Sequence, residues 1–212
     1  MPRRIAPLGG RGDTAAADCA RYCVLARELG ASDARPMAAA EVVVDERVTL
    51  KCCVPKCFSY NTCANCPPHA PAQDRMRGIV AQYRHAVALR LAVPAAVIVR
   101  DRATIAERVA AYQALFAIVD RVESAAFYDG HYLAVGFGAG SCRSTFCGTQ
   151  PCAVLAGTKC RRALKARPSL EAVGIDAFRL AAGLGWEMHP IGSDAAAAEI
   201  PGGNLLGLVL VA

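Results

Sequence analysis

Cysteine is the residue type whose spacing in this sequence points to chemistry. Five of the eleven cysteines lie between Lys51 and Pro68, in the segment KCCVPKCFSYNTCANCPP, which we call the first group. Four more lie between Ser141 and Arg161, in the segment SCRSTFCGTQPCAVLAGTKCR, the second group. A single buried thiol packs as a small apolar group, whereas several thiols at short, unequal spacings suit a soft metal. Each group can therefore supply four thiolates to a metal.

We predict eight metal ligands, four from each group. They are Cys52, Cys57, Cys63 and Cys66 in the first group, and Cys142, Cys147, Cys152 and Cys160 in the second. Structural zinc sites usually combine two short pairs of ligands, and only Cys63 and Cys66 have that spacing. Iron–sulfur clusters take thiolates strung irregularly along a loop, with a proline after the last cysteine as in Cys66-Pro67. The spacings therefore favour one or two iron–sulfur clusters of the 4Fe–4S type, with zinc as the alternative.

The remaining cysteines and the nearest histidine have structural explanations. Cys19 and Cys23 lie four residues apart on one face of an expected helix, where we expect buried packing residues. Cys53 directly follows a predicted ligand, and adjacent residues of an extended chain point to opposite sides, so Cys52 and Cys53 would rarely serve one metal. His69 follows the first group, and we expect an exposed loop residue because four cysteines already complete the site.

Composition limits the class of protein. With 212 residues, of which 54% are hydrophobic and 20% charged, the chain is long enough for one real core. It has no apolar run of the ~20 residues that a membrane span needs, so we expect a cytoplasmic protein with no membrane partner. In that reducing compartment an odd number of cysteines argues for metal ligation over disulfides. The net charge of +6 comes without interleaved aromatic residues, so we expect no nucleic acid as partner.

The elements that must hold the two groups are predicted from periodicity and from helix and strand breakers. We expect an α+β fold: a single compact domain with a mixed or antiparallel sheet, several helices and two cysteine-rich metal-binding loops. Residues 1–40 are expected to form an N-terminal extension with one helix, and residues 41–212 the metal-binding domain. The expected helices cover residues 13–30, 71–84, 104–128 and 168–183, the last bent at Gly174. The expected strands cover residues 41–51, 86–93, 132–137, 186–191 and 205–211.

Longer segments extend the pattern beyond the cysteines. They are KCCVPKCFSY, NCPPHAP, FYDGHYLAVGFGAGSC and CRRALKARPSLEAVGIDAFRLAAGLGW. With them the chain resembles an uncharacterised bacterial and archaeal family of predicted metal-binding proteins, a domain-of-unknown-function family. The resemblance covers roughly residues 45 to 192 and is most distinctive in ARPSLEAVGID. It implies a cysteine-ligated metal, commonly suspected to be iron–sulfur, with no settled activity.

The resemblance also bears on which cysteines are ligands. It implies a first set of Cys52, Cys57 and Cys66, and a second set of Cys142, Cys147, Cys152 and Cys160. Cys63 stands where the family carries a non-cysteine residue, and Asn61 replaces a glycine that is usual after the tyrosine. Without Cys63 as a ligand, the first site has three cysteines and an open position, unless Cys53 or another group completes it. The two-residue interval between Cys63 and Cys66 argues instead that Cys63 is a ligand.

Metal binding is the function that these residues indicate. We expect an iron–sulfur protein that acts in cytoplasmic electron transfer, or as a small redox subunit, with an unknown redox partner protein. The sequence has no nucleotide-binding glycine fingerprint, Walker sequence or nucleophile elbow, and an electron carrier needs none of them. Two alternatives remain: a structural or regulatory zinc-binding module, and an enzyme that uses an open-site iron–sulfur cluster as a Lewis acid. Arg167 is expected either to pair with Glu171 or to lie over the second cluster.

Overall fold

The fold is built on an antiparallel β-sheet. The computed structural model describes residues 14–99, 103–192 and 195–212, and within these ranges the sheet has four strands in the order β1-β2-β4-β3. The strands are β1 (Asp33–Ala38), β2 (His85–Val93), β3 (Val135–Phe137) and β4 (Gly203–Leu210). Every neighbouring pair of strands is antiparallel. The predicted α+β fold with an antiparallel sheet is therefore confirmed.

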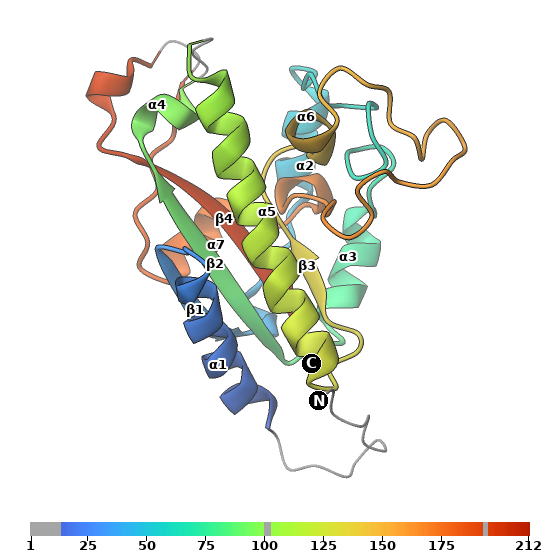
Figure 1. Cartoon of the computed structure of the whole chain (residues 1–212), viewed down its shortest axis with the longest axis vertical. Coiled ribbons are helices and arrows are strands. Elements are labelled where there is room, and N and C mark those ends of the chain that lie inside the picture. The colour runs from blue at the N-terminus through green and yellow to red at the C-terminus, as the bar shows by residue number, and fades with distance from the viewer. Residues whose placement is uncertain (1–13, 100–102, 193–194) are drawn as a thin grey trace.

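Two long helices cover one face of the sheet (Figure 1). They are α1 (Ala15–Glu28) and α5 (Ile105–Tyr128), and the short α4 (Ala95–Ile98) precedes α5. Leu115, Val119 and Val122 of α5 are fully buried, and their steps of four and three residues place them on one side of the helix. Gly207 of β4 lets this side approach closely, because a Cβ at Gly207 would lie 2.8 Å from Cγ2 of Val119. The sheet therefore fixes the position of α5.

The opposite face of the sheet is covered by short helices and turns. They are α3 (Gln73–Val80), α7 (Ala177–Gly183), η1 (Ala39–Glu41) and η2 (Glu171–Val173), the last two being single 3-10 turns. Met76, Leu170 and Ile175 are fully buried in this second core. The other described helices are α2 (Glu46–Cys53), α6 (Cys142–Phe146) and η3 (Ala197–Glu199). Two of these, α2 and α6, carry cysteines of the two groups.

The strand predicted over residues 41–51 is wrong. The chain instead forms the end of η1 and then helix α2, whose N-cap is Asp45. The carboxylate of Asp45 accepts a hydrogen bond from the backbone N–H of Arg47 at 2.9 Å, which satisfies a free amide of the first helical turn. This capping contact outweighs the strand preference of the valines and the threonine in the segment.

Three other segments show where sequence periodicity predicts the secondary structure and where it does not. The sequence predicts no strand over β1, which pairs with β2 along its whole length. Residues 186–191 form no strand. The helix predicted over residues 168–183 is wrong in its first half, where Ser169 forms a β-bridge with Gly138 and only the 3-10 turn η2 follows. The expected break at Gly174, where φ is +83°, and the restart as α7 after the N-cap Asp176 are confirmed. Whether β1 and residues 186–191 form strands depends on pairing with distant segments, which the local sequence does not indicate.

The N-terminal helix packs on the same sheet as the rest of the chain. Tyr22 and Cys23 of α1 are buried in one hydrophobic core with Leu89 of β2. Cys19 and Cys23 are both buried, as expected for packing residues. The domain boundary predicted at residue 40 stays a prediction. None of the helices in the described ranges has the length and apolar content needed to cross a bilayer.

Candidate metal centre

The two cysteine groups lie together on one side of α5, although they are far apart in the sequence. Helices α2 and α6 and the loops around them gather there (Figure 1). Phe116 of α5 is fully buried against Cys63, Cys66 and Cys142. The chain passes close over this ring because residue 138 is a glycine: a Cβ at Gly138 would lie 2.7 Å from Cε1 of Phe116. The fixed helix thus provides the apolar floor on which both groups meet.

The thiols divide between two cavities. The large cavity, about 680 Å³, is lined by Cys52, Cys57 and Cys66. The small cavity is lined by five thiols: Cys63, Cys142, Cys147, Cys152 and Cys160. The structure therefore keeps the four cysteines of the second group around one cavity and adds Cys63 to them. The ligand role of each thiol stays a prediction.

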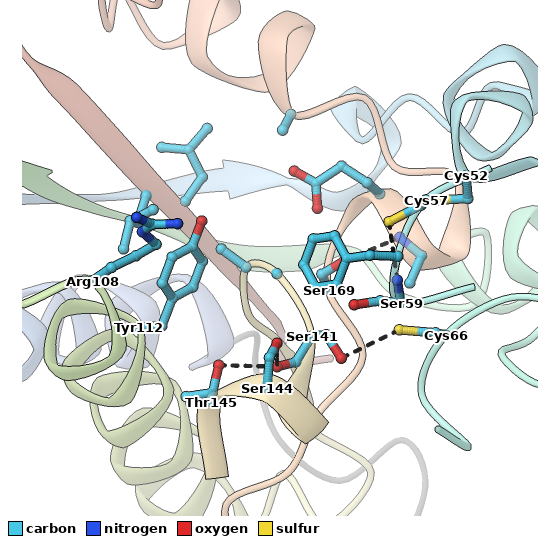
Figure 2. Close-up of a pocket in the computed structure, with 18 of the residues that line it drawn as sticks. Cys52, Cys57, Ser59, Cys66, Arg108, Tyr112, Ser141, Ser144, Thr145 and Ser169 are labelled. Carbon is cyan, nitrogen blue, oxygen red and sulfur yellow. Dashed lines mark hydrogen bonds between the residues drawn. The ribbon is translucent and has the colours of Figure 1, made fainter. Parts of the chain in front are cut away.

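Ser141 lies between the two cavities and contacts a thiol on each side. The Ser141 hydroxyl contacts the Cys66 thiol, with Oγ and Sγ 3.7 Å apart, and Figure 2 shows this contact beside the large cavity. The same hydroxyl lies 3.7 Å from Sγ of Cys63. The sulfur of Cys63 in turn lies 4.0 Å from the sulfur of Cys142. The Cys142 sulfur also accepts a hydrogen bond from the side-chain amide of Asn65 at 3.4 Å. These contacts join the two groups directly.

Hydrogen bonds among the three buried thiols favour a single thiolate at Cys63. The S–H groups of Cys142 and Cys66 donate to Cys63, which holds the pKa of Cys63 well below that of a free thiol. The same hydrogen bonds, together with burial, raise the pKa of Cys66 and Cys142, because those thiols keep their protons as donors. Metals bind the thiolate, so a metal bound at Cys66 or Cys142 would displace a proton.

The thiols of the first group repel one another when charged. Burial raises the pKa of Cys52, and the charge of Cys57 raises it further. Cys57 also contributes to the raised pKa of Cys66, after the larger effects of Cys63 and burial. The sulfur of Cys57 accepts a hydrogen bond from the backbone N–H of Ser59 at 3.5 Å (Figure 2). A bound metal cation would relieve this repulsion, which is the electrostatic condition expected of a ligand set.

Cys53 and Asn61 of the first group, and His69 just after it, are exposed. Cys53 lies at the end of α2, and its thiol donates to the carbonyl of Thr49 at 3.7 Å. The extended backbone expected at this position is therefore wrong, and the helix directs the Cys53 thiol to its own preceding turn. Asn61 has φ of +59°, a left-handed conformation that favours glycine, and its side chain contacts Nε2 of His69 at 2.7 Å. This conformation explains why glycine suits the position.

Backbone groups hold the loop of the second group. Burial raises the pKa of Cys152, but three backbone N–H groups donate to its sulfur and lower the pKa below that of a free thiol. The donors are Leu155, Ala64 and Val154. Because Ala64 belongs to the first group, this sulfur also ties the two loops together. Arg143 donates to two carbonyls of the same loop, at 3.0 and 3.1 Å.

Several residues that the sequence analysis missed line the large cavity. Arg108 and Tyr112 of α5 lie across the cavity from Cys57 and Cys66 (Figure 2), and Glu171 of η2 lines it as well. Burial raises the pKa of the Glu171 carboxyl above its usual value. The sequence signal was available in α5, where a charged residue stands four positions before an inward-facing tyrosine on an otherwise apolar stripe.

Arg167 has a different partner from the one expected. Its guanidinium donates two hydrogen bonds to the carboxylate of Glu123, at 2.8 and 2.9 Å. Glu123 also accepts a hydrogen bond from the backbone N–H of Gly136 at 2.7 Å. The expected pairing with Glu171 is therefore wrong, because α5 offers a carboxylate that fits both guanidinium nitrogens. Arg167 anchors the end of the second loop to α5.

A model of one protein family matches residues 35–211, and its description is Predicted metal-binding protein (DUF2284). The chain belongs to this family. The matched residues include all nine cysteines of the two groups, so the resemblance noted in the sequence is confirmed. No curated protein and no solved structure shows significant similarity to the chain.

The thiols that line the large cavity are of the chemical type that an iron–sulfur cluster requires. Across the described residues, no three Cys, His, Asp or Glu side chains converge closely enough to hold one metal ion. A 4Fe–4S cluster takes its four ligands on four different irons, so its ligand sulfurs stand apart. Cys52, Cys57 and Cys66 are of the right chemical type, and the cavity between them and α5 has room for a cluster. These residues therefore fit the group.

Proposed function

We propose that this metal-binding protein carries an iron–sulfur cluster on Cys52, Cys57 and Cys66 and is an enzyme. The division of the thiols supports the proposal, because these three line a cavity of about 680 Å³ while Cys63 lines the small cavity with the second group. Volumes of about 300 to 1,000 Å³ are typical of sites for small organic molecules. Neither an electron carrier nor a structural zinc module needs such a cavity beside its ligands.

A cluster held by three thiolates supplies Lewis-acid chemistry, because one iron is left without a protein ligand. The residues of this chain would hold and tune it. The Ser59 N–H donates to Cys57, and the Ser141 hydroxyl contacts Cys66. Hydrogen bonds of this kind orient metal ligands and set the properties of iron–sulfur clusters. The remaining walls of the large cavity would bind the molecule on which the iron acts.

Electron transfer through the second group is a second candidate function. Arg143, Arg161 and Arg162 line the small cavity, and cations near a cluster tune its potential. A basic loop of this kind also suits an acidic redox partner protein. The small cavity measures about 20 Å³, close to the volume of one water molecule, so a cluster would require the loop to open. We therefore place the proposed cluster at the first group and not at the second.

The test is reconstitution of the anaerobically purified protein with iron and sulfide, followed by metal analysis and electron spin resonance. One cluster gives roughly four irons per chain, and two give roughly eight. Cys66→Ala is expected to lose the iron of the first cluster, because it removes one of three thiolates. Cys63→Ala, the matched control, is expected to keep that iron and its spectrum, because its thiol faces the other cavity.

Two further results bear on the proposal. Mild oxidation is expected to remove the iron that lacks a protein ligand and to produce the spin signal of a three-iron cluster. Stoichiometric zinc without acid-labile sulfide would refute the proposal in favour of the zinc module. Loss of the same iron in Cys63→Ala as in Cys66→Ala would show that Cys63 completes a four-thiolate cluster, and electron transfer would then replace the enzyme.

A further inference from the structure

The net charge of the chain is concentrated in one segment. Residues 141–167 contain no Asp or Glu and six cations: Arg143, Lys159, Arg161, Arg162, Lys165 and Arg167. The net charge of the whole chain is also +6, so the other residues carry equal numbers of positive and negative charges. Figure 1 shows the loop that follows α6 standing away from the sheet. The excess positive charge therefore lies on one projecting part of the fold.

Four exposed cations of this loop form what we call the basic surface: Lys159, Arg161, Arg162 and Lys165. Within the described ranges, none of the four forms an ion pair with a carboxylate. Arg161 donates a hydrogen bond to the carbonyl of Pro151 at 2.9 Å, and this neutral acceptor leaves its charge uncompensated. Arg167 is paired with Glu123 and is not part of the surface.

Exposed apolar side chains lie on the same loop. Leu164 is 81% exposed, the largest value among the exposed large apolar residues of the described chain. Val154 and Leu155 are each 42% exposed. Burial in the core does not account for apolar residues in this setting, and three of them on one loop form a patch. Apolar residues bordered by charges are typical of a surface that binds another protein.

Hydrogen bonds within the loop hold the basic surface in a defined shape. The backbone N–H and the hydroxyl of Thr158 both donate to the carbonyl of Ala153, at 2.9 and 3.0 Å. The N–H of Lys165 donates to the carbonyl of Arg162 at 2.9 Å, which closes a second turn. A surface that is already ordered loses little conformational entropy when a partner binds.

The basic surface lies over the thiols of the second group. Arg161 and Arg162 line the small cavity together with its five thiols. From Cys63 in that cavity, the Ser141 hydroxyl leads to Cys66 at the large cavity, with 3.7 Å between the oxygen and each sulfur. A protein bound at the basic surface would therefore lie directly beside the cysteines that we predict to be metal ligands.

We infer that the basic surface binds an acidic electron-carrier protein of the ferredoxin type. Carboxylates of the carrier contact the four cations, and an apolar area on it covers Leu155 and Leu164. One electron then passes from the reduced carrier to the metal centre, with no bond made or broken. That the partner carries electrons rests on the second candidate function, electron transfer through the second group. That the partner is an acidic protein rests on the basic surface alone.

The composition of the loop favours an acidic protein over a nucleic acid. Proteins that bind single strands stack the bases on aromatic side chains. Residues 141–167 contain one aromatic residue, Phe146, and its ring packs against Phe116 of α5 with the centroids 5.2 Å apart. The loop therefore exposes aliphatic side chains between its charges and offers no free aromatic ring for stacking.

The test measures the affinity of a 4Fe–4S ferredoxin for the full-length, anaerobically reconstituted protein by calorimetry at low salt. The test variant neutralises three exposed cations of the basic surface: Lys159→Gln, Arg162→Gln and Lys165→Gln. The control variant neutralises three exposed cations on α3, α5 and α7: Arg75→Gln, Arg121→Gln and Arg179→Gln. The test variant is expected to bind roughly 10-fold more weakly than the wild type, and the control variant nearly as tightly as the wild type. Leu164→Ala is expected to weaken binding roughly 3-fold without changing its salt dependence.

Each outcome decides the inference. It is overturned if the ferredoxin binds no more tightly than a ferredoxin whose carboxylates have been amidated, or if the test variant binds as the wild type does. Equal weakening in the control variant would show an effect of net charge alone and would also overturn it. Tighter binding of a single-stranded oligonucleotide would assign the surface to nucleic acid instead.

Iron and sulfide counts on the same samples test the proposed clusters separately. Ferredoxin binding that depends on the basic surface in protein containing only zinc would refute the clusters and support the docking surface. Protein that holds its clusters but does not bind ferredoxin would overturn the docking surface and leave the proposed function standing.

Discussion

Replacing Arg167 with alanine should destabilise the protein strongly, because its ion pair with Glu123 is largely removed from solvent. The side chains of Arg167 and Glu123 are 15% and 19% exposed, and two hydrogen bonds of 2.8 and 2.9 Å join them. A second carboxylate, Asp120, lies 3.6 Å from the same guanidinium. The variant would leave Glu123 in this setting with only the N–H of Gly136 as a described partner.

The expected magnitude follows from these contacts. Removing one partner of a fully buried pair costs about 3 to 5 kcal/mol. The residual exposure of both side chains admits solvent screening, so we reduce this to about 2 to 3 kcal/mol for Arg167→Ala. For a chain of this length each kcal/mol lowers Tm by roughly 2 to 4 °C. The expected decrease in Tm is therefore roughly 4 to 12 °C.

The assay is thermal unfolding followed by circular dichroism, with Arg121→Ala as the matched control on an exposed site of α5. Arg121→Ala is expected to unfold within about 0.5 kcal/mol of the wild type, as is usual for exposed substitutions. Arg167→Lys should fall between the wild type and Arg167→Ala, because lysine keeps the charge but cannot make the paired hydrogen bonds. If Arg167→Ala is as stable as Arg121→Ala, the anchoring role assigned to this pair is wrong.

Two further predictions concern a glycine at the site and the response to acid. Gly140→Ala should lower the free energy of unfolding by about 2 to 3 kcal/mol, because φ there is +66° and the new Cβ would lie 2.7 Å from Cε1 of Tyr112. Gly148→Ala is the control, with φ of +58° and open space around the new Cβ, and should lower it by only about 1 kcal/mol. Both values are measured by urea unfolding. Burial raises the pKa of Asp33, but hydrogen bonds from Trp186 and two arginines lower it well below the usual range. The stability that Asp33 contributes is thus present above its unfolded pKa of about 4 and is lost as pH falls through the lower folded pKa. The difference in unfolding free energy between wild type and Asp33→Asn should shrink below about pH 4, and a constant difference from pH 6 to 3 would contradict this.

The parts of the fold that the sequence predicts are those with strong local patterns. Helix α5 was expected over residues 104–128 because its apolar residues repeat at helical steps, and it spans Ile105–Tyr128. Strand β2 was expected from a short, strongly apolar run and spans His85–Val93. Strand β1 has the sequence DARPMA, which lacks β-branched and aromatic residues, so only its pairing with β2 makes it a strand. A local sequence pattern predicts a helix or strand whose own residues favour that structure, and it fails where pairing with a distant segment determines the structure.

The candidate site shows the same division between local and long-range information. Residue type and spacing identify the cysteines of both groups, because clustered thiols have a chemical use that single ones lack. The opposite wall of the large cavity is not visible in this way. Arg108 and Tyr112 belong to an ordinary amphipathic helix in the sequence, and they become candidates only once the sheet fixes α5 against the cysteine loops. Their place at the cavity follows from the packing of α5 and not from any motif.

Cys63 and Cys66 show why spacing alone cannot assign ligands to a site. Two residues separate them, which places both thiols within reach of one metal centre, and the sequence therefore favours a shared site. In the structure the Cys66 N–H donates to the Cys63 carbonyl at 3.1 Å, so a tight turn joins the two residues. The Ser141 hydroxyl lies 3.7 Å from each sulfur, and the two thiols line different cavities on either side of it. Spacing reports how far a ligand can reach, whereas the segment that packs against the turn determines which cavity it reaches. Ser141 comes from the second group, so residues far along the chain decide which thiols of the first group line the large cavity and which line the small one.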